Sequence, residues 1–575
     1  MVLRISLLAC VFFLSYASRA HDSTSYYLIY LKDKQLSEYH ISRPGEFLSQ
    51  QAIERRIKKN ISIQYSDLPV SGAYIRQVSA VRGVRIIHQS KWLNAIEISS
   101  KGKSSAIDSI RALPCVSGIE FLGRIKDRHK PAIEPVAPSY HEKARNLQKI
   151  KNDLTENNMA IPDHGKSSLQ SELIGIDRLH GQTYGNGVHI AVFDAGFFNA
   201  YQVPGMEDLL MPDVIIRDFV DYDNSVWEDD RHGANVLGFM KTFSPGRYIG
   251  SAPLARYTLV RTENPTSEYP TEEVNWLFGA EFADSLGVDL IVSSLGYHTF
   301  DDPSLSHTHA QLDGKTSIVA RAANFAYEKG IMLVTSAGNE GGSKWRRIGT
   351  PSDAPGVIGI GACDKNGFHA GFSSYGPSAD GRVKPDFLSL GQQAMVASPA
   401  GFYQSNGTSY ATPIVGGAVA CLMAAFPDKT REEIRNALMQ SATHFSQPDS
   451  AYGYGLADFN LAMNILGKFN DGRDTSGDFL YTKTSPVFFQ DMGIHFRSKT
   501  SQKVRITIKG LRKKRLKSIL KMSYVLEAGE WLHDSTLLSF YKKESRKKRK
   551  HKVRELIVSI ETSNGSFLKT IHLHY

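Results

Sequence analysis

The chain has 575 residues, too many for a single hydrophobic core, so we expect several domains. Apolar residues make up 41% of it and charged residues 22%, a composition that excludes a disordered or fibrous protein. The formal net charge is +10, and much of the excess lies in the mostly basic run Lys542 to Lys552. Such a run can bind nucleic acid or acidic polysaccharide. Because no interleaved aromatic residues or nucleic-acid motif accompany it, we prefer a solvated loop between strands and expect no nucleic-acid partner.

Residues 1–20 have the build of a secretory signal. Arg4 supplies the positive start, Ile5 to Tyr16 is mostly apolar, and Ser18-Arg19-Ala20 is a small-x-small cleavage site. The apolar part is too short to span a bilayer, and no later stretch is expected to do so. We therefore expect an exported protein, secreted or held at the cell surface.

The block from residue 21 to residue 127 mixes both kinds of periodicity. Strand patterns lie at 26–31, 84–87, 94–98 and 118–121, and helix patterns at 46–57, 73–81 and 104–113. This order predicts a small α+β domain. Residues 128–169 have little apolar periodicity and contain several prolines, which predicts an exposed linker with a processing site.

From residue 170 to residue 467, apolar strands alternate with helices. Strands are expected at 188–193, 257–260, 289–292, 331–334 and 357–360, and helices at 271–285, 317–329 and 430–443. The alternation predicts an α/β domain with a parallel sheet and helices on both faces. Ligands bind beyond the carboxyl ends of such strands. Asp194, the segment Ser294-Leu295-Gly296 and Asn339 all follow strand ends, so we expect them to share one crevice.

Ser409 lies just before an apolar run that predicts a buried helix. A serine in this position is usually a helix cap. The free N–H groups of a helix start can also receive the oxyanion formed when a hydroxyl attacks a carbonyl. Attack by serine needs a base and a carboxylate to hold that base. His232, at the start of a predicted helix, and Asp194 supply these groups, and Asn339 offers a side-chain donor.

The order Asp194, His232, Ser409 along the chain is that of the subtilisins, and chymotrypsins and α/β-hydrolases order the three residues differently. The segments around these residues, with Ala337-Gly338-Asn339 and Gly407-Thr408-Ser409-x-Ala411-x-Pro413, resemble the subtilisin-like serine proteases over about residues 170–465. The resemblance implies that Ser409 is the nucleophile, His232 the general base and then acid, and Asp194 the residue that orients His232.

The resemblance also implies how substrate is held. Asn339 would donate to the oxyanion together with the backbone N–H of Ser409. Ser294, Leu295 and Gly296 would pair with the substrate backbone as an added strand. The same segment, with Ala337 and Gly338, would flank the pocket for the side chain before the scissile bond. Glu340 beside this pocket hints at basic side chains.

Two departures from the family concern histidine and metal. Relatives commonly carry a second histidine where this chain has Asn235, outside the triad. The segment 241–248, where many relatives bind calcium, holds no carboxylate. The loop 301–309 contains aspartates and histidines that could hold a metal, but a solvated insertion is the preferred interpretation. We therefore expect no metal and no cofactor.

The flanking domains complete the comparison with the family. By resemblance, residues 21–127 are a propeptide that assists folding, inhibits the enzyme and is released by self-cleavage in the linker. Residues 468–575 contain short β-type runs that predict a small all-β module. It loosely resembles the C-terminal sorting domain of type IX secretion, chiefly through residues 557–565, which would imply contact with secretion machinery or cell-surface attachment. An adhesive β-domain is the alternative.

The sequence thus predicts an exported serine endopeptidase, made as a self-processed zymogen, that acts on protein or peptide substrates. A catalytically silent homologue that serves in binding or adhesion is the main alternative. A serine esterase is a third interpretation, against which the chain order and the propeptide-like block argue. The preferred side chain of the substrate is not specified.

Overall fold

The computed structural model describes residues 23–101, 104–126, 137–157 and 163–469. Beyond these it describes the strands at 479–483, 493–497, 502–512, 515–526, 531–534, 555–562 and 565–572. The expected signal at 1–20 and the basic run at 542–552 lie outside the described residues.

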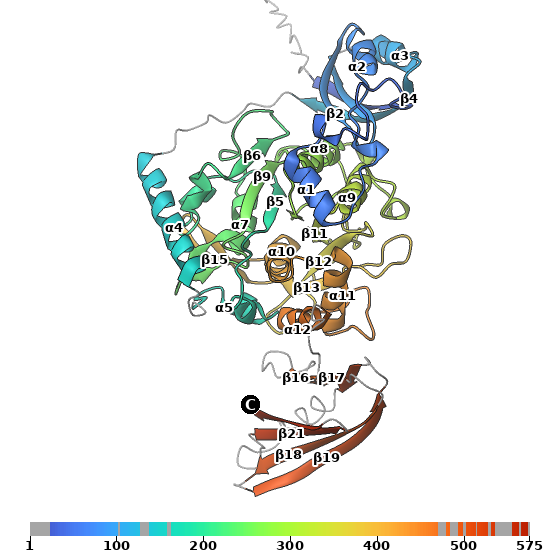
Figure 1. Cartoon of the computed structure of the whole chain (residues 1–575). Helices are drawn as coiled ribbons and strands as arrows, with labels where there is room; N and C mark the ends of the chain where they lie inside the picture. Colours follow the sequence, from blue (N-terminus) through green and yellow to red (C-terminus); the bar gives the residue numbers. More distant parts are fainter. Residues whose placement is uncertain are drawn as a thin grey trace, which may run out of the picture.

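The N-terminal block is an α+β domain, as expected (Figure 1). Its antiparallel sheet has the order β2-β3-β1-β4. The strands are β1 (Ser23–Leu31), β2 (Val84–Ser90), β3 (Ala95–Ser100) and β4 (Val116–Lys126), and the helices are α1 (Gln50–Lys58), α2 (Gly72–Ser79) and α3 (Ser104–Arg111). Side chains alternate across a strand, so Ile29 packs in the domain's own core while Leu28 joins a core shared with the next domain.

A parallel, seven-stranded sheet forms the centre of the next domain, in the order β13-β12-β11-β10-β5-β9-β6. Its strands are β5 (His189–Asp194), β6 (Ile215–Asp218), β9 (Arg256–Arg261), β10 (Leu290–Ser293), β11 (Met332–Ser336), β12 (Val357–Cys363) and β13 (Phe387–Leu390). Short hairpins are β7 (Phe243–Ser244) with β8 (Tyr248–Ile249) and β14 (Ala394–Ser398) with β15 (Gly401–Ser405).

Helices cover both faces of this sheet, as the sequence predicts. On one face α8 (Thr271–Ser285) and α9 (Ile318–Glu328) pack against Ala191 and Phe193 of β5. On the other, α7 (His232–Lys241) and α10 (Thr408–Ala425) pack against Ile190 and Val192. The remaining helices are α5 (Ser168–Glu172), α6 (Ile176–Leu179), α11 (Arg431–Ser441) and α12 (Phe459–Phe469).

Among the described residues, α10 is the one helix long and apolar enough to cross a membrane, although no stretch after residue 20 is expected to be one. Its apolar window is 83% buried inside the protein, which is typical of a core helix. Two glycines bring it close to its neighbours. A Cβ at Gly416 would stand 2.6 Å from Val292 of β10, and one at Gly417 would stand 2.0 Å from Ser251 Oγ.

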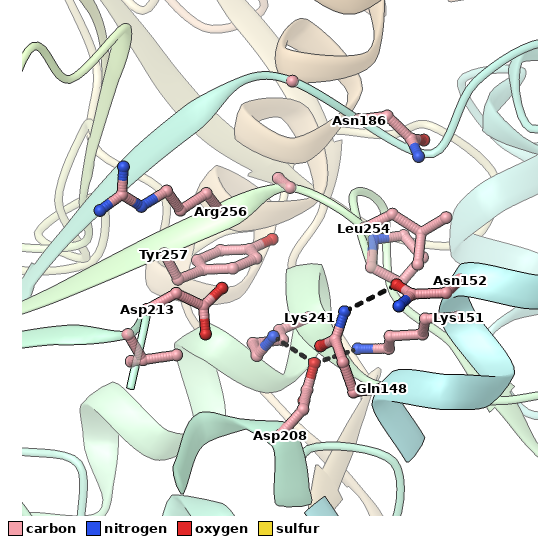
Figure 2. A pocket seen from close by; sticks show the side chains of 14 residues that line it. Gln148, Lys151, Asn152, Asn186, Asp208, Asp213, Lys241, Leu254, Arg256 and Tyr257 are labelled. Atoms are coloured by element: carbon pink, nitrogen blue, oxygen red, sulfur yellow. Dashed lines mark hydrogen bonds and ion pairs between the residues drawn. The ribbon is translucent and has the colours of Figure 1, made fainter. Parts of the chain in front are cut away.

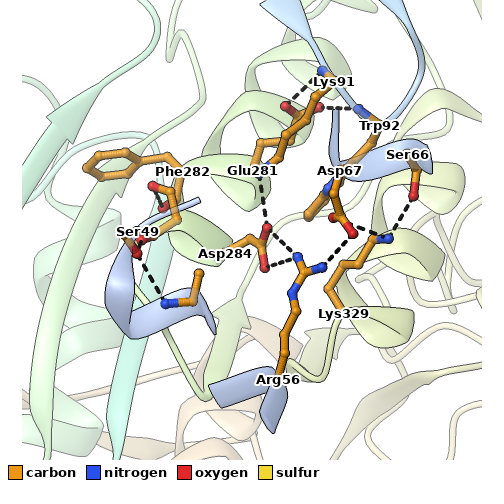
Figure 3. A network of polar contacts seen from close by, with 12 residues as sticks. Ser49, Arg56, Ser66, Asp67, Lys91, Trp92, Glu281, Phe282, Asp284 and Lys329 are labelled. Carbon is orange, nitrogen blue, oxygen red and sulfur yellow. Dashed lines mark hydrogen bonds and ion pairs between the residues drawn. The ribbon is translucent and has the colours of Figure 1, made fainter. Parts of the chain in front are cut away.

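The N-terminal domain lies on α8 and α9 through a buried polar network as well as apolar contacts (Figures 1 and 3). Asp284 of α8 accepts from both arginines of α1, Arg55 and Arg56, and from Lys91 Nζ at 3.1 Å. Arg56 also donates to Asp67 Oδ2 at 2.6 Å. Three cations of one domain therefore converge on one carboxylate of the other.

The expectation that residues 128–169 are exposed is wrong for one face of their central part, where Ala144, Leu147 and Lys151 are buried. Residues Pro138–Asn157 form helix α4, which packs against the 3₁₀ helix Glu207–Leu210. Lys151 Nζ donates to Asp208 Oδ2 at 2.8 Å, and Lys241 Nζ donates to the same atom at 2.9 Å (Figure 2). Leu147 packs with Phe243 and Ile249. The apolar pattern is weak because a lysine, rather than an apolar residue, continues the buried face of Ala144 and Leu147.

Replacing Lys151 with alanine should destabilise the chain by about 2 kcal/mol, because a buried hydrogen bond to a charged group is lost. The midpoint of denaturant unfolding, measured on full-length chains whose intact mass has been checked, reports the effect. Lys149→Ala is the matched control, since Lys149 is exposed on the same helix. Equal midpoints for the two lysine variants would contradict the anchoring role of Lys151.

The described C-terminal strands are β-type, as predicted. β19 (Arg515–Leu526), β18 (Gln502–Arg512), β21 (Glu555–Thr562) and β22 (Gly565–His572) pair antiparallel in that order. β16 (Phe479–Lys483), β17 (Gly493–Arg497) and β20 (Trp531–Asp534) form a second antiparallel sheet. The resemblance to a sorting domain stays a prediction.

Candidate active site

The carboxyl edge of the seven-stranded sheet brings the predicted site residues together. β5 ends at Asp194, the neighbouring β10 leads into Ser294, and β11 leads through Ala337 and Gly338 into Asn339. His232 begins α7, and Ser409 lies in the first turn of α10. Because β5, β10 and β11 are parallel neighbours, these segments meet at one edge, as expected for this class of sheet.

Asp194, which is fully buried, forms a hydrogen-bonded pair with His232, whose side chain is 32% exposed. His232 Nδ1 lies 2.8 Å from Asp194 Oδ1, which also accepts from the backbone N–H of Ala195 at 2.8 Å. The approach depends on Gly233, because a Cβ there would stand 2.8 Å from the Cβ of Asp194. Burial lowers the pKa of His232, but the charge and hydrogen bond of Asp194 outweigh this and raise it above its ordinary value.

Ser409 is buried except for a small exposed part and is held against β10. Its Oγ donates to the backbone carbonyl of Ser294 at 3.2 Å, and its own carbonyl accepts from Ser294 Oγ at 2.9 Å. Among the described contacts no hydrogen bond joins Ser409 Oγ to His232. A serine hydroxyl moves between staggered rotamers, and the hydrogen bond between nucleophile and base is often formed only when substrate is bound.

The carboxamide of Asn339 is oriented by Thr408, next to Ser409 in the sequence. Asn339 Oδ1 accepts from the backbone N–H of Thr408 at 2.9 Å and from its Oγ1 at 3.0 Å. With the oxygen engaged in this way, the Nδ2 group is the part of Asn339 available to a ligand.

A cavity of about 590 Å³ joins these groups. Its lining includes His232, Ser409 and Asn339, together with Ser294, Leu295, Gly296 and Gly338. Ala337 lies behind this wall: it is fully buried, and its backbone bonds to Ile360 and Gly349. The structure therefore brings together every predicted site residue, with Ala337 beneath the surface of the cavity.

Three acidic residues of the cavity lining were not predicted from the sequence. Glu263, Glu268 and Asp301 face the same cavity. A signal for the first was present, because Glu263 follows the end of β9 much as Asp194 ends β5. In the loop 301–309, His307 bonds to Glu273 and His309 packs edge-on against Trp345, so both histidines have protein partners.

Two segments of the chain match known protein families. Residues 185–455 match the subtilase family, and residues 26–137 match the peptidase S8 propeptide domain of Bacteroidota. Subtilisin E of Bacillus subtilis is 27% identical over 379 residues, which cover 64% of this chain and 89% of that protein. Serine protease AprX of the same organism is 29% identical over 321 residues, covering 50% of this chain and 69% of its own.

Among solved structures, the MycP3 protease from the type VII (ESX-3) secretion system aligns with a TM-score of 0.42 at 21% identity, covering 52% of this chain and 89% of its own. The family match and the subtilisin relatives span the domain that carries the Asp194–His232 pair and Ser409. The chain therefore contains a subtilisin-like serine endopeptidase domain of the subtilase family, preceded by a peptidase S8 propeptide domain.

Proposed function

We propose that the protein is an exported endopeptidase that cuts peptide bonds through an acyl-enzyme on Ser409 and is made as a self-processed zymogen. The observation that carries the proposal is the meeting of His232, Ser409 and Asn339 on one cavity, with Asp194 bonded behind His232. We further propose the domain limits drawn from the sequence: a signal at 1–20, a propeptide at 21–127, a processed linker at 128–169, a catalytic domain at 170–467 and a β-rich module at 468–575.

The geometry supports a two-step acyl transfer. The bond from His232 Nδ1 to Asp194 leaves Nε2 to take a proton from Ser409 Oγ once the hydroxyl turns toward it. Oγ then attacks the carbonyl carbon of the scissile bond. The resulting oxyanion accepts hydrogen bonds from Asn339 Nδ2 and from the backbone N–H of Ser409. The proton passes from His232 to the leaving amine. In the second step His232 takes a proton from water, the water attacks the acyl-enzyme, and the proton returns to Ser409 Oγ as the acid product leaves.

Asp194 stabilises the imidazolium that forms on His232 in each step. Its second carboxylate oxygen, Oδ2, is buried without a hydrogen bond among the described contacts, so its charge is poorly neutralised in the resting state. The electrostatic attraction between such a carboxylate and the neighbouring ring is strong once the ring becomes positive. The substrate backbone would lie along Ser294, Leu295 and Gly296 as an added strand.

The Ser409→Ala chain tests the proposal through its own maturation. We expect wild-type protein to separate into propeptide and mature fragments, while purified Ser409→Ala stays a single polypeptide, as followed by gel and intact mass. Ser446→Ala, at an exposed serine, should process like wild type. A Ser409→Ala chain that is still cut when purified alone would exclude self-processing.

A further inference from the structure

One wall of the active-site cavity is built from carboxylates. We call Glu263, Glu268, Glu272 and Asp301 the acidic wall. Carboxylate oxygens of the three glutamates lie within 4.8 Å of one another, and Asp301 Oδ2 accepts from the backbone N–H of Glu268 at 3.2 Å. Glu263, Glu268 and Asp301 line the cavity that contains Ser409. The acidic wall is thus part of the predicted substrate cleft.

The acidic wall has no cationic partner within the described part of the chain. None of its members forms an ion pair there, and neither lysine nor arginine lines the cavity. Nearby acidic groups are neutralised by a cation. Asp218 and Asp221 both pair with Arg261, the last residue of β9, which precedes Glu263 by two positions. Because the chain has 68 basic and 58 acidic residues, a shortage of cations does not explain the difference.

Glu263 is the clearest case of an unused acceptor. Its residue surface is only 8% exposed, yet it lines the cavity. Its Oε1 accepts from the Tyr297 hydroxyl, and its Oε2 accepts no hydrogen bond among the described contacts. This oxygen is not among the fully buried side-chain atoms without a partner, so it opens onto the cavity, where a ligand can donate to it.

Burial and mutual repulsion act on these groups together. Burial, followed by repulsion from Asp301 and Glu273, raises the pKa of Glu268 to about 7. Burial and the nearby Glu268 likewise raise the pKa of Glu263. A positive charge that entered the cavity would relieve the repulsion and replace lost solvation.

The chain's own propeptide brings basic residues toward the acidic wall. Strand β4 crosses the start of α8 so closely that a Cβ at Gly123 would stand 2.5 Å from the ring of Tyr269. Its last residue, Lys126, lines a second cavity together with Asn264 and Ser267, which also line the active-site cavity. Arg124 and Lys126, near the end of this strand, are both basic.

The order of strands gives the distance from the acidic wall to the scissile bond. Asn339 follows β11, and Glu263 follows β9, three strands away in the order β11-β10-β5-β9. Neighbouring strands are spaced about 4.8 Å apart, so the two positions are separated by roughly 14 Å, which an extended peptide spans in about four residues. In the proposed pose, substrate residues before the scissile bond lie along Ser294, Leu295 and Gly296, so the wall is assigned to residues further upstream on that side.

We propose that the acidic wall selects peptides with lysine or arginine roughly two to four residues before the scissile bond. This inference rests on the proposed function, because it assigns a substrate class to the same cleft. The basic side chain would reach Glu263 and Glu268, and its charge-assisted hydrogen bonds would fill the acceptors left open there.

Matched fluorogenic peptides test the selection on the processed full-length enzyme. Each pair differs only by arginine or norleucine at one position, scanned over the residues before the scissile bond. At the best position we expect kcat/KM to favour arginine by about ten- to hundredfold, as for a charge-assisted hydrogen bond in a partly desolvated site. The variants Glu263→Gln and Glu268→Gln should reduce this ratio toward one. Asp213→Asn, which removes an exposed charge elsewhere, should keep it.

Three outcomes would overturn the inference. The arginine and norleucine peptides could be cut equally by wild type, or the preference could survive in both glutamate variants. Added calcium could instead raise the thermal stability of wild type but not of Glu268→Gln, without any arginine preference, which would make the wall a metal site. Equal cutting leaves the proposed function intact. That function fails if no peptide is cut and Ser409 is not acylated by a fluorophosphonate.

Discussion

Replacing Asp194 with asparagine is expected to lower kcat/KM by about 10⁴-fold while the fold is retained. Asp194 Oδ1 is the only described partner of His232 Nδ1, so the carboxylate sets which ring nitrogen carries the proton. An asparagine can present its NH₂ group to Nδ1 and stabilise the wrong tautomer. Peptide hydrolysis and a circular dichroism spectrum, measured on the same preparation, separate loss of chemistry from loss of structure.

The pH dependence of kcat/KM shows whether Asp194 acts on His232 or has a merely structural role. Because Asp194 raises the pKa of His232 above 6.5, and only the neutral ring accepts a proton, kcat/KM should reach half of its limit above pH 6.5. In Asp194→Asn the negative charge that raises the pKa of His232 is gone. The fall of kcat/KM on the acidic side of the profile, the acidic limb, should therefore move to lower pH. Asp213→Asn should leave both the rate and the limb unchanged, and an unmoved limb in Asp194→Asn would contradict the assigned role.

Asp284→Asn should weaken the hold of the propeptide on the catalytic domain by about 10²- to 10³-fold. Breaking a buried ion pair by removing one partner costs about 3–5 kcal/mol, and each 1.4 kcal/mol is about tenfold in affinity. In this network Arg55, Arg56 and Lys91 of the propeptide all form ion pairs with Asp284. Burial would raise the pKa of Asp284, but these three cations hold it well below its ordinary value.

Two measurements follow the released propeptide. After processing, gel filtration should show the propeptide separating from Asp284→Asn enzyme at concentrations where wild type keeps it, and the lag before peptide hydrolysis should shorten. Arg76→Ala, which removes an exposed cation of the propeptide, should behave like wild type. A propeptide retained equally by wild type and Asp284→Asn would show that apolar contacts alone hold the two domains together.

The sequence predicts the main sheet and its site well because both have local signals. Strands such as Ile190 to Phe193 are continuous apolar runs, and in a parallel sheet their carboxyl ends meet by geometry. Asp194 and Asn339 could therefore be assigned to one edge from sequence alone. Which rotamer Ser409 adopts could not be predicted, since its contact with the Ser294 carbonyl depends on the packing of α10 against β10.

Two features could not be predicted because their signals are polar and non-local. Helix α4 buries Ala144 and Leu147, but the next position of its buried face is Lys151, whose partner Asp208 is remote in sequence, so the apolar period is too short to mark the helix. In the acidic wall, Glu263 and Asp301 are 38 residues apart in the sequence. An acidic residue at either position, taken by itself, is typical of a surface loop. Only the order of the strands brings such residues into one cavity.

The central claim is that Ser409 is the nucleophile, and a fluorophosphonate probe measures this most directly. The processed wild-type enzyme should take up one probe per chain, with the adduct mapped by peptide mass spectrometry to Ser409, and lose peptidase activity in proportion. Ser409→Ala should take up none, while Ser446→Ala should label like wild type. An adduct on another residue, or peptide hydrolysis that persists in Ser409→Ala, would contradict the account.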